Sequence, residues 1–159
     1  MSVEEEFVVQ LRPQRAWGAL VAGDLSLGGT GAGLDFLAVL LRASASWLGL
    51  GLVGLGALLL LLDLGVPNRF WRAYRRPGPS WISRGVYSIS LFGLFAFLAL
   101  LPSLPGLDGL PWGEGTAAGI ALRTLALALA VALMAYTGLL LSSWPSIPFW
   151  NTPLLPIVF

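Results

Sequence analysis

The sequence contains no cysteine and no histidine among its 159 residues, and these two absences exclude several kinds of redox site. Without cysteine, this chain holds no disulfide, no thiolate metal site and no iron–sulfur cluster. Without histidine, it also lacks the usual haem ligand and the usual zinc or copper ligand. We therefore expect no metal site here. Any electrons that the protein handles must come from a partner or from a diffusible carrier.

Charge is scarce as well. Only 11% of the residues are charged and 57% are hydrophobic, with a mean hydropathy of +0.82, whereas a soluble domain carries about 25% charged residues. All nine basic residues are arginine, and they flank apolar stretches, so their partner is the lipid membrane rather than nucleic acid. The composition indicates an integral membrane protein.

Four apolar stretches are long enough to cross a bilayer as helices. They predict an all-α polytopic membrane helix bundle, a single domain over 1–159, with spans at about 17–42, 47–65, 85–101 and 116–141. Residues 1–15 form a polar tail, 16–141 form the four-helix bundle, and 142–159 form a loop and the start of a fifth helix. The last apolar run, 152–159, is too short to span, so we expect the natural chain to continue beyond it.

The first apolar stretch carries two carboxylates, Asp24 and Asp35, which lie eleven residues apart. That spacing is three helical turns plus about 20°, so both side chains share one helix face. A carboxylate inside a membrane is costly unless it faces a protein interior, a partner or water. Between the two lies Gly29-xxx-Gly33, a spacing of small residues that lets another helix approach closely. The stretch predicts a helix with a polar inner face.

Sidedness follows from the number of spans. The N-terminal tail and the loops at 66–84 and 142–151 lie on one side, which carries seven of the nine arginines. The positive-inside rule would place this side in the cytoplasm. The loop at 66–84 combines arginine with large aromatic residues, which are either headgroup anchors or a docking surface for an acidic or phosphate-bearing partner. The candidate docking residues are Arg69, Arg72, Arg75, Arg76 and Trp81.

Asp24 and Tyr136 are predicted at similar depth below that same side. The helical rise puts Asp24 about 10 Å and Tyr136 about 8 Å beneath the ends of their helices. A carboxylate and a phenol can hydrogen-bond the oxygens of a quinone ring, and a carboxylate can exchange its proton. Two simpler interpretations stay open. Asp24 can make a structural hydrogen bond to a neighbouring helix, and Tyr136 can belong to the interfacial aromatic belt.

Three further charged residues lie within the spans. Asp35 either lines a proton path or pairs with Arg123, whose long side chain can also extend to the membrane surface. Asp63, near the end of its span, either joins such a path or bonds the backbone or an arginine of the loop that follows. The possible proton path is Asp35, Asp63 and Arg123.

Three sequence stretches resemble one family. They are LSLGGTGAG, then LLLDLGVPNRFWR followed by PSWISRGVYSISLFGL, and finally YTGLLLSSWPSIPFWNTPLLPIVF. Together they cover most of the chain after Arg15, in the family's order, and the second and third are specific. The chain resembles the NrfD/polysulfide reductase membrane-subunit family.

The resemblance implies a respiratory-complex subunit of the inner membrane that exchanges electrons with menaquinone or ubiquinone. It implies no haem, and a docked iron–sulfur subunit that leads to a catalytic, often molybdopterin-containing, subunit. The family's quinone pocket falls on Asp24 and Tyr136 here, although some relatives have histidine at the position of Asp24. In several members the docking side faces outward, so orientation stays open. The alternatives are a transporter subunit with an intramembrane Asp/Arg path, or a pure membrane anchor.

Overall fold

The computed structural model describes residues 18–41, 43–63 and 81–142, and this part of the chain is helical without strands. Its elements are α1 (Ala19–Leu40), α2 (Ser46–Asp63), α4 (Trp81–Leu100), the short 3-10 helix η3 (Leu101–Ser103) and α5 (Ala117–Ser142). The all-α prediction is confirmed for these residues. The third helix begins at Trp81, four residues before the predicted start. The predicted tail, the arginine-rich loop and the start of a fifth helix lie outside the described residues.

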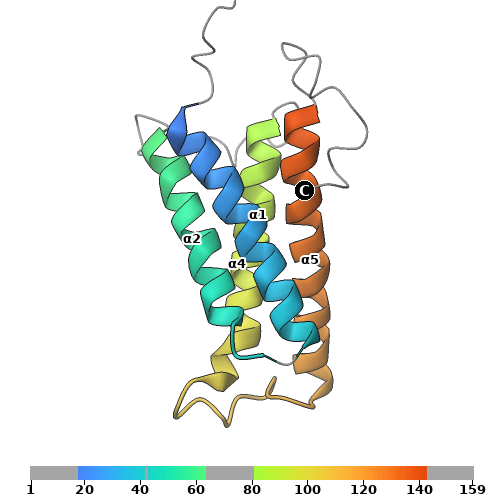
Figure 1. Cartoon of the computed structure of the whole chain (residues 1–159). Helices are drawn as coiled ribbons and strands as arrows, with labels where there is room; N and C mark the ends of the chain where they lie inside the picture. Colours follow the sequence, from blue (N-terminus) through green and yellow to red (C-terminus); the bar gives the residue numbers. More distant parts are fainter. Residues whose placement is uncertain (1–17, 42, 64–80, 143–159) are drawn as a thin grey trace, which may run out of the picture.

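The four long helices run alternately up and down in one bundle (Figure 1). We call the end where α1 and α4 begin and α2 and α5 end the upper end, as drawn there. The lower end holds the short α1–α2 connection and the 101–116 loop. Helix α1 packs most extensively against α2 and also against α5, while α4 packs mainly against α5. Helix α1 therefore borders two neighbours, and its two carboxylates lie inside the bundle.

Three helical segments are long and apolar enough to cross a membrane: Ser46–Asp63, Ser83–Ser103 and Ala117–Ser142. Helix α1, with its two aspartates and many glycines, is not among them, so a fourth span stays a prediction. Large apolar side chains cover the outside of the bundle, among them Leu37, Leu48, Leu58, Leu94 and Ile120. In water such a surface would favour aggregation, but in a bilayer it meets lipid.

Glycines bring α1 and α2 into backbone contact. A Cβ atom on Gly31 would lie only 2.6 Å from the carbonyl oxygen of Gly49, and one on Gly49 would lie 2.7 Å from the carbonyl oxygen of Gly31. The closest contact of α1 is therefore at Gly31, inside the Gly29-xxx-Gly33 pattern that the sequence indicated as a place of close helix approach. Gly29 and Gly33 instead face α5, at ordinary van der Waals distance from Thr137 and Met134.

The centre of the bundle is built from small residues and a few large ones. Ala32 of α1, Val53 of α2, Phe92 of α4 and Leu133 of α5 are all at most 2% exposed and belong to one cluster. Alanines of α4 and α5 fill the space between the large side chains, which lets the helices pack closely. This core leaves the polar groups of α1 above and below it.

Side chains and backbone hold the lower loop to the bundle. The Oγ1 of Thr116 accepts a hydrogen bond from the Gly119 amide at 3.0 Å, which caps the start of α5. The residue before this cap, Gly115, has a φ of +82°, a conformation that glycine adopts without strain. The indole of Trp112 donates to the carbonyl of Leu98 at 3.1 Å. The loop therefore has a defined place beneath the helices.

Candidate functional site

Asp24 is buried in the upper half of the bundle with one oxygen unpaired. Its side chain is 6% exposed, and Oδ1 has no hydrogen-bond partner among the described residues. This oxygen lies against α2, 3.3 Å from the place where a Cβ on Gly56 would be. A buried polar oxygen without a partner costs about 1–3 kcal/mol, so this oxygen is suited to accept a hydrogen bond from a ligand or water, or to bind a proton.

Tyr136 turns into the bundle and meets the start of α4. Its ring packs against the core cluster, and Tyr136 is hydrogen-bonded to the backbone of Gly85. A Cβ atom on Gly85 would overlap the phenol, lying 2.6 Å from Cζ and 2.8 Å from Cε1. Only glycine at this position leaves room for the ring. The alternative of an interfacial belt tyrosine does not fit this inward position.

Asp24 and Tyr136 share one level of the bundle with two glycines. The helical rise puts Asp24, Gly56, Gly85 and Tyr136 about 6–10 Å below the upper end of their helices. Each of the four long helices thus contributes one position to the same level. The shared depth of Asp24 and Tyr136 agrees with the value expected from the sequence. We call these four residues the upper site.

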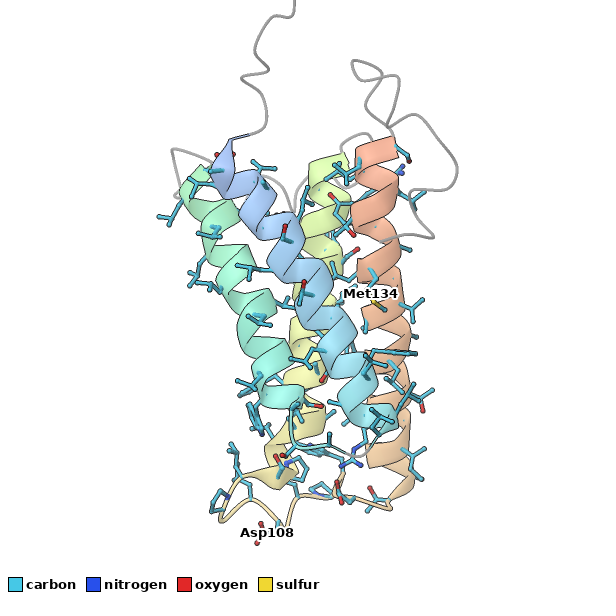
Figure 2. The ribbon with its side chains drawn as sticks, viewed as in Figure 1. Asp108 and Met134 are labelled. Atoms are coloured by element: carbon cyan, nitrogen blue, oxygen red, sulfur yellow. The ribbon has the colours of Figure 1, made fainter. Side chains whose placement is uncertain are left out.

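The sequence did not predict that Gly56 would adjoin Asp24 or that Gly85 would adjoin Tyr136. A glycine inside an apolar helix costs about 1 kcal/mol relative to alanine, so each such glycine has a packing reason in the fold. Gly56 and Gly85 each lie inside an apolar helix, which indicates a packing reason, but the sequence does not show which side chain each glycine accommodates. Met134, which Figure 2 shows on α5, packs against α1: its sulfur lies 3.5 Å from where a Cβ on Gly33 would be.

Asp35 lies at the lower end and not with Asp24. It is 2% exposed and accepts a hydrogen bond from the Ser46 hydroxyl at the start of α2. The predicted pairing of Asp35 with Arg123 is not seen, because Arg123 makes its ion pair with Glu114 of the lower loop. The loop brings this carboxylate to the arginine, which nothing in the sequence predicted. Asp35 and Arg123 nevertheless line one pocket of about 690 Å³.

The remaining predicted residues lie elsewhere. Asp63 is exposed at the upper end of α2, with Oδ1 3.9 Å from where a Cβ on Gly18 would be, so the structure does not bring it together with Asp35 or Arg123. The candidate docking residues Arg69, Arg72, Arg75 and Arg76 lie outside the described residues, as does the side chain of Trp81.

Comparison with known proteins decides the family. The family model described as "Polysulphide reductase, NrfD" matches residues 8–159. The chain belongs to the NrfD family. Among its relatives, Protein NrfD of Escherichia coli (strain K12) is 36% identical over 172 aligned positions, which cover 90% of this chain and 54% of that protein. The chain thus spans about half the length of this NrfD relative. No solved structure gives a significant match.

Membership of the NrfD family and the apolar helices together establish a multi-pass membrane protein. The resemblance seen in the three sequence stretches is confirmed, because the family match includes all of them. The match also extends over the segments outside the described residues. The two carboxylates of α1 therefore lie within an NrfD-type membrane bundle.

Proposed function

We propose that this chain is a membrane subunit of a respiratory oxidoreductase in the inner membrane. It exchanges electrons between a membrane quinone and a docked iron–sulfur subunit, which connects to a catalytic subunit. The observation that carries the proposal is the unpaired, buried Oδ1 of Asp24, at the same level of the bundle as Tyr136. The family membership supports a role in a multi-subunit complex.

The upper site suits a quinone chemically. A quinone ring is apolar with two oxygens, so its site needs an apolar surround and a few polar groups aimed at those oxygens. Tyr136 offers a hydroxyl held by the backbone of Gly85, and Asp24 offers an oxygen that no protein group satisfies. The quinone, when bound, supplies the redox chemistry, which the protein's own side chains do not.

Each residue then has a distinct task. The Tyr136 hydroxyl donates a hydrogen bond to a quinone oxygen and orients the ring. With a quinone bound, Asp24 would pass a proton to a quinone oxygen or take one from it, since a carboxyl group can act as general acid and general base. The close approach of α2 at Gly56 bounds Asp24 on one side.

Removing the phenol hydroxyl with Tyr136→Phe should lower quinol-linked turnover about tenfold, which is the effect of losing one hydrogen bond of about 1.4 kcal/mol. Asp24→Asn retains the shape and a donor but removes proton exchange, so it should lower kcat more than it raises KM. The measurement is quinol oxidation by the assembled complex in membranes, with the partner subunits verified by immunoblot.

Two variants serve as controls. Tyr87→Phe removes the phenol hydroxyl of a tyrosine on α4 that is not one of the four upper-site residues. Asp108→Asn removes a carboxylate from the lower loop, and Figure 2 shows Asp108 far from the upper site. Both should retain wild-type turnover. Wild-type turnover from Tyr136→Phe and Asp24→Asn as well would contradict the proposal.

Docking of the iron–sulfur subunit is proposed to use the arginine-rich loop before α4. Reversing Arg72, Arg75 and Arg76 to glutamate should release the partner during purification, since it replaces attraction to an acidic surface with repulsion. The measurement is the ratio of partner to membrane subunit at rising salt. Reversal of Arg12 and Arg15, on the same predicted side, is the matched charge control. If the triple variant still retains the partner at raised salt, the docking proposal is wrong and the loop is a lipid anchor only.

A further inference from the structure

The pocket at the lower end has no part in the upper site. It encloses about 690 Å³ between α1, the start of α2, the end of α4 and the lower loop, with α5 closing one side. Its polar lining consists of the indole of Trp47 and the side chains of Asp35, Ser44, Ser46, Ser103, Glu114 and Arg123. A pocket of this size can hold a small ligand or a cluster of water molecules.

Polarity and exposure change from the rim of the pocket to its floor. At the rim, the Glu114 side chain is 79% exposed and that of Arg123 is 37% exposed, and the two form an ion pair. The indole of Trp47 donates to the Ser103 hydroxyl at 3.1 Å. At the floor, Asp35 is 2% exposed. The pocket therefore leads from charged groups at the bundle surface to one buried carboxylate.

The charges around Asp35 do not neutralise it. Among the described residues that line the pocket, α2 and α4 contribute no charged group, α5 contributes Arg123, and the lower loop contributes Glu114. Arg123 is already paired with Glu114, and Asp35 has a neutral partner, the Ser46 hydroxyl. A buried carboxylate with only a hydroxyl partner is stable when water hydrates it or when it binds a proton.

We infer that the pocket is a water-filled vestibule through which Asp35 exchanges protons with the aqueous phase at the lower end of the bundle. The carboxylate takes up a proton from water and returns it to water, with no other co-reactant. This vestibule stands independently of the quinone site, because Asp35 and Asp24 are separated by about 16 Å along α1. It gives the bundle a proton-exchanging group near the face opposite the upper site.

Water rather than lipid is the occupant that the lining favours. The rim carries an ion pair, a serine hydroxyl and the α1–α2 turn residues Ala43 and Ser44, all at the end of the helices and not at their middle. Lipid tails avoid such groups, whereas water bonds to them. The lipid-facing leucines lie on the outside of the helices instead.

Cysteine accessibility tests the vestibule, because the sequence has no native cysteine. Ala99 of α4 lines the pocket and is 9% exposed. In sealed membrane vesicles carrying the assembled protein, Ala99→Cys should react with a charged, membrane-impermeant methanethiosulfonate from the lower face only. Since the reactive species is the hydrated thiolate, the reaction should be about tenfold faster than at a lipid-facing cysteine.

Two control variants give the reaction rates with which the Ala99→Cys rate is compared. Leu94→Cys, on the same helix, lies on the outside of the bundle at 52% exposure, and Ala130→Cys lies in the core at 0% exposure. Both should react slowly, the first because lipid surrounds it and the second because it is packed. An Ala99→Cys rate equal to that of Leu94→Cys overturns the proposal and means that the pocket holds lipid.

A water-soluble carbodiimide tests the carboxylate itself. It reacts with protonated carboxyl groups, so peptide mass spectrometry should find Asp35 modified from the lower face, increasingly as the pH is lowered. Asp24 should stay unmodified from that face, and the exposed Glu114 reports that the reagent has arrived. Modification of Glu114 without Asp35 overturns the inference. None of these readouts depends on quinone turnover, so a failure here is distinct from a failure of the proposed function.

Discussion

Gly85→Ala should lower quinol turnover about a hundredfold while the bundle stays folded. A Cβ on Gly85 would lie 2.6 Å from Cζ of Tyr136, so the phenol must leave its place. The atoms that the new methyl group meets belong to a side chain and not to a backbone, so the phenol can shift while the helices keep their places. Displacing a binding group by about 1 Å costs on the order of a hundredfold in rate.

The control for this variant is Gly93→Ala on the same helix. A Cβ there has no neighbour within 4 Å, so the substitution tests the change from glycine to alanine alone. Thermal unfolding in detergent and quinol turnover are measured for both variants. We expect similar unfolding temperatures for the two and loss of turnover only for Gly85→Ala. Normal turnover of a folded Gly85→Ala complex would mean that the position of the phenol does not matter to the reaction.

Gly31→Ala should instead destabilise the bundle by about 1–3 kcal/mol, the usual cost of forcing an extra methyl group into a packed contact. Its Cβ would lie 2.6 Å from the carbonyl oxygen of Gly49 and 2.9 Å from the amide nitrogen of Val53. These are backbone atoms of α2, and no side-chain rotation removes them. Helices α1 and α2 must therefore move apart.

Gly51→Ala is the matched control on α2, because its Cβ would have no neighbour within 4 Å. The measurement is the denaturant or thermal midpoint of the purified protein in detergent, followed by the helix signal. Gly51→Ala should leave the midpoint unchanged or raise it slightly, since alanine favours helix over glycine. A Gly31→Ala midpoint equal to that of Gly51→Ala would show that the two helices can adjust at little cost.

Replacing glycine with alanine thus has different consequences at Gly85 and at Gly31. At Gly85 the neighbour is a movable phenol, so function is lost and the fold is retained. At Gly31 the neighbour is the backbone of α2, so the fold is weakened first. Sequence alone does not distinguish these glycines, because the relevant neighbour lies on another helix in each case.

Several features follow from local sequence properties. The apolar stretches predicted the four long helices to within a few residues, since long apolar runs bounded by charged and loop-forming residues indicate helices. The helical rise put Asp24 and Tyr136 at one depth, because alternating helices share their ends. The family was also recognisable from its sequence stretches. The role of Asp24 and Tyr136 with quinone stays a prediction.

Other features depended on which helix faces which. The sequence suggested that Gly29 and Gly33 let another helix approach closely, and that Asp35 either lines a proton path or pairs with Arg123. The structure has Gly31 against Gly49, Arg123 with Glu114, and Asp35 with Ser46. Periodicity determines which residues of one helix share a face, but the rotation of that helix about its own axis depends on packing with its neighbours. Sequence by itself therefore determined the membrane class, the helices and the depth of the polar groups. Only the tertiary structure decided the contacts between helices, because those contacts join residues that no local pattern relates.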